Sequence, residues 1–553
     1  MNVKLIILGI GLVWGGCYVA RAQSAHFSYF SYEGKDLRFE QPFSPANQYQ
    51  NPVIAGFYPD PSVCRKGDTY YLVNSSFAFF PGVPLFESKD LVSWKQAGHV
   101  LDRDSQLPLQ GNDVSAGIFA PAIEYNKKND TFYMVTMNMG NYTVFYVKSK
   151  DPAKGWSEPI HLKEGGMDPS FFFDEDGKGY LVYTTRPFGG QNYPGEMAIH
   201  MNEFCTSGDS ICSKSVELVR GGTNIELQPQ WLEGPHMYRV GKYYYLMCAE
   251  GGTGNEHTEV IFRSKNPYGP WESCPNNPIL SQSKEADNPF PVSSTGHADL
   301  IQTKEGDWWS VFLGCRPYES DFYNTGRETF LLPVTWKDGW PTILQAGKTV
   351  PGIGNKPNLK TDEQRPTGNR TYTDLFNESS LDKEWMFLRN PKRECYHLTK
   401  QGITIDAQPA NIYQKESISA IFRRQQHTRF TATTEVNFTP HSEKDLAGMV
   451  ALQNEAYNFV FGKTILNGRP SLVLSRTEKE KAVIGTVILN EEEADLPIQL
   501  RIAGDGKYYT FYYRTDSGEW HTLAQGIDAS NLSTHKAGGF IGTMIGLYVT
   551  SNQ

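Results

Sequence analysis

One unit recurs five times between residues 60 and 315, and it constrains the fold more than any other feature of the chain. Each copy has a short head, a tight turn rich in Gly, Asp or Asn, and a strand rich in aromatic residues. Each spacing between copies leaves room for a four-stranded unit with its loops. Such repeats in an all-β pattern predict a five-bladed β-propeller. The copies start at Asp60, Ala120, Asp168, Glu233 and Gly296.

The strands of each copy are predicted from residue period and turn chemistry. Turns such as KGD, KKND and KEGD lead into runs such as TYYLV, TFYMV and DWWSV. Aromatic and β-branched runs that flank such turns are typical of β-hairpins. No segment of this region keeps an apolar period of 3.6 residues over three turns, so we expect few helices.

When the five copies are aligned, three of their heads carry a carboxylate at the equivalent position. These residues are Asp60, Asp168 and Glu233. Equivalent positions around a central axis would bring these side chains into one pocket. An Asp before Pro often only caps a turn, but three acids at repeat heads favour a shared site. Two facing carboxyl groups suffice to hydrolyse a glycoside, and a third raises the proton affinity of the acid through like-charge repulsion.

Length and charge narrow the classes of protein that remain. At 553 residues the chain needs more than one core. The formal net charge of −9 makes nucleic acid and anionic membranes unexpected partners. Lys4, an apolar run over 5–13 and the sequence VARA before Gln23 predict a signal peptide over 1–22. We therefore expect an exported protein, periplasmic or secreted, with a lipid anchor on Cys17 as the alternative and no membrane span.

The cysteines predict neither a disulfide framework nor a metal cluster. Beyond Cys17, seven cysteines are scattered through the chain, an odd number. Cys205 and Cys212 flank a polar loop and can bridge in an oxidising compartment, although the sequence leaves the pairing open. The spacings match no Cys/His ligand pattern, so we expect no bound metal from them.

The chain changes character after the repeats. We assign residues 45–345 to the propeller and 346–368, which are polar, Gly- and Pro-rich and without periodicity, to a linker. Alternating strands return over 369–553, with no trace of the repeat. Many short strands of this kind predict a β-sandwich of the jelly-roll or concanavalin-like type. Such modules bind sugars or serve as structural flanks.

Seven ordered motifs carry a resemblance to a known family. They are NPVIAGFYPDPSV, NSSFAFFPGVPLF, GIFAPAIEYN, GMDPSFFFDEDGKGY, LEGPHMY, GHADLI and GRETFLLPVTW. Together they resemble glycoside hydrolase family 43, in particular its β-xylosidase and α-L-arabinofuranosidase branch with a C-terminal β-sandwich. The resemblance covers nearly all of the chain after the signal peptide.

The resemblance implies an exo-acting enzyme that removes a terminal pentosyl unit from plant hemicellulose with inversion of configuration. By position, Asp60 would be the general base and Glu233 the general acid. Asp168 would orient Glu233 and raise its pKa. These roles agree with those inferred from the repeats, and the family requires no cofactor for this reaction.

The resemblance also implies residues that hold the sugar. Arg327 would bind hydroxyl groups in the terminal subsite, where a guanidinium has donors to spare, and an ion pair with Glu328 or Asp321 is the alternative. Phe77 and Phe119 would form a wall for the sugar, with packing between blades as the alternative. Phe119 stands where relatives often carry Trp, which leaves the shape of the subsite open.

Two further residues follow from the resemblance. His297 heads the fifth copy and would lie under the active site, where in some relatives it faces an axial calcium ion or water, so a structural Ca²⁺ near His297 is an alternative. Phe540, in the sequence GGFIG, would reach from the sandwich to the terminal sugar and close one end of the pocket. An ordinary core position in the sandwich is the alternative for Phe540.

Two other functions compete with this one. An endo-acting arabinanase would use the same propeller, although the C-terminal module and the GGFIG loop favour a closed pocket over an open groove. A non-catalytic glycan-binding propeller would use the acids to bind sugar hydroxyls. The expected partner in every case is an oligosaccharide or polysaccharide. The sequence does not separate xylose from arabinofuranose, and it leaves the linkage and the oligomeric state open.

Overall fold

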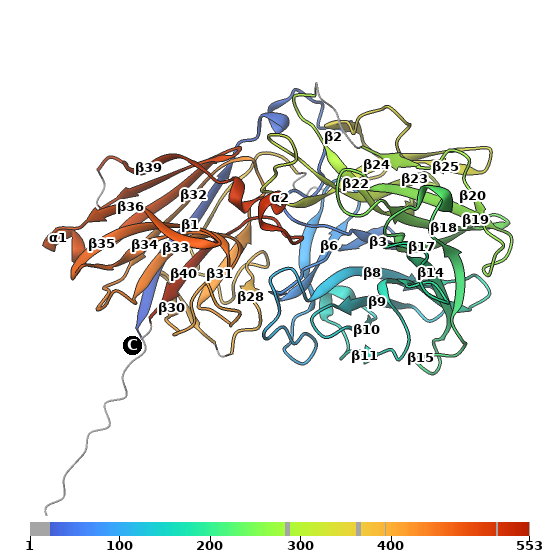
Figure 1. The fold of residues 1–553 in the computed structure, drawn as a ribbon, viewed down its shortest axis with the longest axis horizontal. Helices are drawn as coiled ribbons and strands as arrows, with labels where there is room; N and C mark the ends of the chain where they lie inside the picture. The colour runs from blue at the N-terminus through green and yellow to red at the C-terminus, as the bar shows by residue number, and fades with distance from the viewer. Residues whose placement is uncertain (1–22, 283–287, 361–366, 393, 516–517, 552–553) are drawn as a thin grey trace, which may run out of the picture.

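The computed structural model describes residues 23–282, 288–360, 367–392, 394–515 and 518–551. The predicted signal peptide and part of the predicted linker lie outside these ranges. The described chain is built almost entirely from strands, arranged in two bodies that lie side by side (Figure 1). The two α-helices in these ranges are short, α1 (Glu491–Asp495) and α2 (Thr534–Ala537). Among the described residues, no helix has the length and apolar character to cross a membrane.

The first body contains five successive antiparallel sheets of four or five strands, and the first strand of each sheet contains one repeat head or begins just after it. The repeats therefore correspond to structural units, as predicted. In chain order their strands are β3 (Ser62–Lys66), β4 (Thr69–Val73), β6 (Gly82–Ser88) and β7 (Lys95–Leu101); β8 (Ile118–Asn126), β9 (Thr131–Asn138), β10 (Thr143–Ser149) and β11 (Ile160–His161); β12 (Met167–Phe173), β13 (Gly179–Thr185), β14 (Ala198–Cys205), β15 (Ser210–Ile211) and β16 (Val216–Arg220); β17 (Glu233–Val240), β18 (Tyr243–Glu250), β19 (Thr258–Ser264), β20 (Glu272–Ser273) and β21 (Leu280–Ser281); and β22 (Ser293–Gln302), β23 (Trp308–Cys315), β24 (Arg327–Lys337) and β25 (Trp340–Thr342).

The first strands of the five sheets contact one another in a ring. β3 packs against β8, β8 against β12, β12 against β17 and β17 against β22, and β22 returns to β3. Because successive side chains of a strand point to opposite faces, each sheet buries residues against both of its neighbours. The start of each first strand is thereby held near the centre of the ring.

The second body is made of two sheets packed face to face. One has the order β31-β40-β33-β34-β35-β36, and the other has the order β29-β30-β1-β32-β37-β38-β39, with β27 paired to β1. The strands are β1 (Ser24–Gly34), β27 (Thr371–Asp374), β29 (Tyr396–Thr399), β30 (Gly402–Asp406), β31 (Ala420–Arg424), β32 (Arg429–Asn437), β33 (Leu446–Asn454), β34 (Tyr457–Leu466), β35 (Arg469–Glu478), β36 (Glu480–Ile488), β37 (Ile498–Asp505), β38 (Tyr508–Arg514), β39 (His521–Asp528) and β40 (Met544–Thr550).

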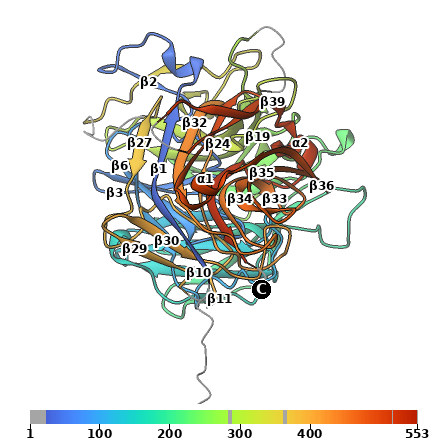
Figure 2. The same ribbon diagram turned by 90° about the vertical axis from the view of Figure 1, so that its left-hand side faces the viewer.

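The N-terminal strand β1 belongs to this second body, outside both predicted domain ranges. It pairs antiparallel with β30, β32 and β27, and Figure 2 shows it in blue among the orange strands. Phe27, Phe30 and Tyr32 are buried in the core that the two sheets share. The first described residues of the chain therefore complete a sheet whose other strands come from its last third.

The remaining short elements lie in connections and at the boundary of the two bodies. The pair β5–β28 links the bodies directly, because Phe79 and Phe80 pair with Leu388 and Phe387. These elements are the 3₁₀ helices η1 (Leu37–Glu40), η2 (Pro152–Lys154), η3 (Ile225–Leu227) and η4 (Ser530–Leu532), and the strands β2 (Gln48–Gln50), β5 (Phe79–Phe80), β26 (Ile353–Asn355) and β28 (Phe387–Leu388).

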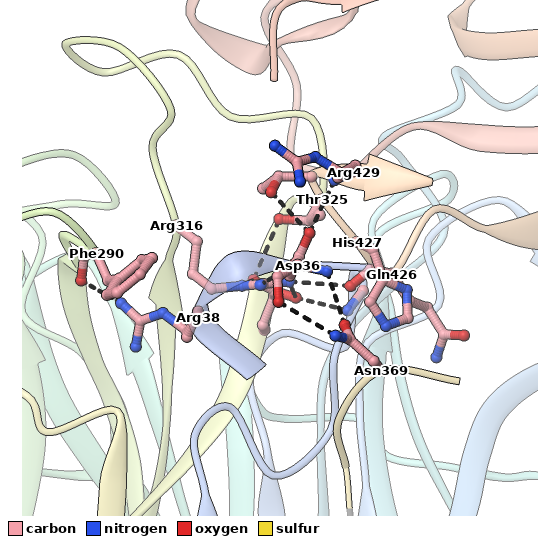
Figure 3. Close-up of polar contacts among 12 residues, drawn as sticks. Asp36, Arg38, Phe290, Arg316, Thr325, Asn369, Gln426, His427 and Arg429 are labelled. Carbon is pink, nitrogen blue, oxygen red and sulfur yellow. Dashed lines mark hydrogen bonds and ion pairs between the residues drawn. The ribbon is translucent and has the colours of Figure 1, made fainter. Parts of the chain in front are cut away.

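A buried ionic network fixes the second body to the fifth sheet (Figure 3). Arg316 binds Asp36 at 2.6 Å and donates to Glu328 Oε1 at 2.8 Å and to the carbonyl oxygen of Gln426 at 2.9 Å. Asp36 also accepts a hydrogen bond from the backbone amide of Arg429 at 2.8 Å. Because every charge in this network has partners, burial is tolerated. The two bodies therefore meet through a fixed interface.

Candidate active site

The five repeat heads share one unusual backbone conformation. Each first strand has a residue with positive φ at or near its start. That residue lies two positions before β3 and inside β8, β12, β17 and β22, and each of those four strands shows a register shift there. Left-handed conformations of residues other than glycine cost energy, and they concentrate at functional sites. The heads thus place five equivalent backbone positions on the strands that form the ring. These residues are Asp60 (φ 52°), Ala120 (35°), Asp168 (49°), Gly234 (59°) and His297 (49°).

This geometry corrects the alignment of the fourth repeat. Asp60 and Asp168 are equivalent, as predicted, but Gly234 takes their position in the fourth sheet. Glu233 comes one residue earlier, where the second and third sheets have Phe119 and Met167. The physical reason is the turn, because the residue directly before the proline must be left-handed and glycine adopts that conformation without strain. Glu233 therefore leaves the backbone from a different point than the two aspartates do.

Asp60 lies among groups that stabilise its negative charge. The Ser75 hydroxyl donates a hydrogen bond to its Oδ2 at 2.6 Å. Its Oδ1 lies 3.5 Å from Arg327 Nη1 and 3.7 Å from His297 Nδ1. Burial alone would raise the pKa of Asp60, but Arg327, His297 and the Ser75 hydroxyl together lower it below the usual value. Asp60 is thus a carboxylate at neutral pH and can accept a proton.

Glu233 has the opposite character. Burial raises its pKa well above the usual value, the negative charges of Asp168 and Asp60 raise it further, and Arg327 opposes them. The pKa of Asp168 is also raised, by burial and by Asp60, although His297 and the Gly234 amide at 3.2 Å act against this. Glu233 therefore keeps its proton at a pH where Asp60 has lost its own.

An aromatic cluster with contributions from both bodies lies beside the acids. Phe77 lies 5.2 Å from Phe119 and 6.2 Å from Phe540 between ring centroids. The Arg327 guanidinium lies 5.3 Å from the centroid of Phe540, and the Phe540 amide donates to Ser115 Oγ at 2.9 Å. Phe540 comes from the second body, so that body contributes to the site. Phe119 and Phe540 keep exposed surface, whereas Phe77 is 1% exposed and lies behind them.

The structure separates Arg327 from its alternative partners. Its side chain faces Asp60, while Glu328 pairs with Arg316 and Asp321 accepts a hydrogen bond from Asn255. Arg327 is also buried, at 6% exposure, so it does not take part in an ion pair on the surface.

His297 is buried between two of the heads. Its Nδ1 faces Asp60, and a Cβ atom on Gly234 would lie 3.0 Å from its Nε2. The glycine at this point of the fourth sheet therefore leaves room for the imidazole. In the described ranges, no group of three or more His, Cys, Asp or Glu side chains has the arrangement of a metal site. These residues therefore identify no ligands for a calcium ion near His297, and the binding of calcium there stays a prediction.

Sequence reasoning missed two buried groups next to this site. His257 is 1% exposed, its Nδ1 lies 3.0 Å from the carbonyl oxygen of Ser294, and burial lowers its pKa to about 4. Glu259 accepts a hydrogen bond from the Ala298 amide at 2.9 Å, and burial raises its pKa well above the usual value. The sequence signal that could have identified them is a pair of titratable residues two positions apart in the apolar strand sequence HTEVIF. They support the turn that carries His297.

One open question about the cysteines is settled. Cys205 and Cys212 form a disulfide across the β14–β15 hairpin. The other described cysteines are buried inside the protein, as is typical of cysteine outside disulfides. They are Cys64, Cys248, Cys274, Cys315 and Cys395.

Comparison with protein-family models assigns both bodies. The model described as "Glycosyl hydrolases family 43" matches residues 49–341. The model described as "Beta xylosidase C-terminal Concanavalin A-like domain" matches residues 373–553. The two matches follow the first body and the C-terminal strands of the second.

Individual relatives agree over nearly the whole chain. A non-reducing end α-L-arabinofuranosidase of Bacteroides ovatus is 38% identical over 511 residues, which cover 91% of this chain and 92% of the relative. A xylosidase/arabinosidase of Butyrivibrio fibrisolvens is 37% identical over 521 residues, covering 91% and 96%. The crystal structure of a GH43_12 protein from a capybara gut metagenome is 41% identical, with a TM-score of 0.89 over 96% of this chain and 100% of that one.

Proposed function

This chain belongs to glycosyl hydrolase family 43, and we propose that it is an exo-acting, inverting glycosidase of plant hemicellulose or oligosaccharides derived from it. It removes a terminal pentosyl unit, either α-L-arabinofuranosyl or β-D-xylosyl. The activities named for its relatives in Bacteroides ovatus and Butyrivibrio fibrisolvens support this substrate class. The feature that carries the proposal is a pair of buried, electrostatically interacting carboxyl groups, Asp60 and Glu233, whose pKa values are shifted in opposite directions.

The opposite pKa directions assign a role to each acid. Asp60 accepts a proton from water as the water oxygen attacks the anomeric carbon. Glu233 gives its proton to the glycosidic oxygen as the bond between that oxygen and the anomeric carbon breaks. In an inverting enzyme the two carboxyl groups are about 6.5–9.5 Å apart, which leaves room for the water. Asp168 acts through its charge, because it keeps Glu233 protonated.

The terminal sugar is held by the groups around these acids. Arg327 donates hydrogen bonds to its hydroxyl groups, and its distance to Asp60 supports a place in the terminal subsite. Phe119 and Phe540 offer exposed ring surface to one face of the sugar, and Phe77 supports both rings. His297 orients Asp60 from below.

The contribution of the second body favours exo action over endo action. A chain interior needs an open groove, whereas Phe540 enters the site from the second body and lies next to Arg327. The non-catalytic alternative is disfavoured because sugar binding alone does not require one protonated and one ionised carboxyl group side by side.

The proposal includes the architecture that positions the site. We take the five sheets and the ring of their first strands as a five-bladed β-propeller over 45–345, joined through 346–368 to a β-sandwich over 369–553 that β1 completes. We also propose that the protein is exported. The Cys205–Cys212 disulfide supports an oxidising compartment.

The experiment that tests the function compares two aryl glycosides. The purified protein is assayed with p-nitrophenyl β-D-xylopyranoside and with p-nitrophenyl α-L-arabinofuranoside. The wild type is expected to release p-nitrophenol from at least one of them. Glu233→Gln is expected to lose activity on the corresponding substrate whose leaving group is a sugar. Activity on neither substrate, or product mixtures typical of internal cleavage of arabinan, contradicts the proposal.

A further inference from the structure

The loop that leads into the proposed general acid carries an unusual set of exposed apolar side chains. Within residues 225–231, Leu227 is 77% exposed, Ile225 is 46% exposed and Trp231 is 45% exposed. Single exposed apolar residues are common and need no explanation. Three within seven residues, one of them a tryptophan two positions before Glu233, call for one.

Trp231 is held in place by the backbone around it. Its φ is 53°, and its amide donates to the carbonyl oxygen of Gly195 at 2.9 Å. The Gly251 amide donates to the carbonyl oxygen of Gln230 at 2.8 Å. A tryptophan kept in a left-handed conformation by tertiary contacts is typical of a functional position. The backbone that carries the ring is therefore held in place before any ligand arrives, which lowers the entropic cost of binding.

Further contacts fix the rest of this loop. The Thr223 amide and hydroxyl donate to the Glu250 carboxylate at 2.9 and 3.0 Å. A Cβ atom on Gly252 would lie 3.3 Å from Cδ1 of Trp231, so the indole lies directly against the 251–254 loop. The indole is therefore packed against this glycine while 45% of the residue stays exposed.

The position of the ring relative to the acid identifies its ligand. Two residues of extended chain span at most about 7 Å, so Trp231 lies close to Glu233. Leu232 between them is buried in the core at 1% exposure, while Trp231 and Glu233 both keep exposed surface. The general acid protonates the oxygen that joins the departing sugar to the rest of the substrate. Groups next to the acid on its exposed side therefore meet the leaving group.

We propose that Trp231 is a stacking platform for the first sugar of the leaving group. It thereby sets a preference for substrates whose leaving group is a sugar ring over substrates whose leaving group is a small alcohol. This inference rests on the proposed function, because it requires Glu233 to be the acid. The flat indole matches the apolar face of a pyranose ring, as in the xylose units of a hemicellulose backbone. Leu227 and Ile225 continue the apolar surface along the same loop.

The test compares two leaving groups of similar acidity that differ in shape. The wild type, Trp231→Ala and Trp231→Phe are assayed with β-1,4-xylobiose and with methyl β-D-xylopyranoside. If the wild type prefers arabinofuranosides, arabinofuranosyl-xylobiose and methyl α-L-arabinofuranoside replace them. Both leaving groups need protonation, but only the sugar can stack. Tyr508→Ala is the matched control, because Tyr508 is 49% exposed on β38 of the second body.

The expected result is a change in the ratio between the two substrates. In Trp231→Ala, kcat/KM for the disaccharide relative to the methyl glycoside falls about tenfold, equivalent to about 1.4 kcal/mol. Trp231→Phe restores most of the ratio, and Tyr508→Ala keeps it. An equal loss on both substrates, an unchanged ratio, or a change of oligomeric state in place of the kinetic effect overturns the proposal. A wild type inactive on all four substrates instead defeats the proposed function, and this inference with it.

Discussion

Removing the charge of Asp168 should shift the pH profile of the enzyme in one direction. The pKa of Glu233 is raised first by burial and then by Asp168. Asp168 lies next to the backbone of Glu233, because its Oδ2 accepts from the Gly234 amide at 3.2 Å. At an effective dielectric constant of about 20, two unit charges about 6 Å apart interact by about 2.8 kcal/mol, so a carboxylate at such a distance has a large effect on the pKa of its neighbour. Asp168 has a raised pKa itself and is not fully ionised at every pH, so we expect the pKa of Glu233 to fall by less than a full charge would cause.

The sign of the shift follows from the role of Glu233. The acid must be protonated, so activity is lost as the pH rises through its pKa. In Asp168→Asn that pKa is lower, and the alkaline limb of kcat/KM against pH moves to lower pH. The asparagine oxygen can still accept the Gly234 amide hydrogen bond, so the substitution removes charge while retaining the contact.

The assay is a kcat/KM profile between about pH 4 and pH 10 for the wild type and the variant, with a sugar leaving group. Asp174→Asn is the matched control, because Asp174 follows the far end of the same strand and pairs with Arg239 at 2.7 Å. Its profile should keep the alkaline limb of the wild type. An unchanged limb in Asp168→Asn, or a limb moved to higher pH, would refute the electrostatic role of Asp168.

Three further substitutions test separate parts of the account. Glu233→Gln should reduce kcat by about 10²–10⁴-fold with a sugar leaving group and by less with a 2,4-dinitrophenyl group, which leaves without a proton. Phe540→Ala should lower kcat/KM about tenfold through lost apolar contact, with a small change in Tm; unaltered kinetics would remove the second body from the site. Arg316→Met should destabilise the fold by about 3–5 kcal/mol in urea unfolding, because Asp36 and Glu328 stay buried without their cation; stability close to that of the wild type would contradict this.

The repeats allowed much of the first body to be predicted, because each copy combines a turn signal with a strand signal. The offset of Glu233 was missed because the copies were aligned on their acids. Aligning them on the proline would have paired Gly234 with Asp60 and Asp168, since the residue before the proline is the left-handed one. In the four copies that carry this proline, the local backbone geometry is therefore marked by the proline and the residue before it, and an acid at that residue is not required.

Long-range placement could not be derived in the same way. Phe27, Phe30 and Tyr32 form one buried face of β1, with a β-bulge between Phe27 and Phe30, but the sequence pattern alone does not say which sheet the strand joins. The pairing of β1 with β32 joins residues about four hundred positions apart. Likewise, only the family resemblance pointed to Phe540. His257 and Glu259 could not be assigned from the sequence, because the role of a buried titratable residue in an apolar strand depends on neighbours that are distant in the sequence.

The stereochemistry of the first product tests the central claim most directly, namely that Asp60 activates water on one side of the sugar while Glu233 protonates the leaving oxygen on the other. Proton NMR during the first minutes of hydrolysis, before the free sugar equilibrates, reports which anomer forms. The account predicts inversion: α-xylose from a β-xyloside, or β-arabinose from an α-arabinofuranoside. Asp60→Asn should form neither while remaining folded. A first product that retains the configuration of the substrate would contradict the account, because Asp60 would then have to attack the sugar itself.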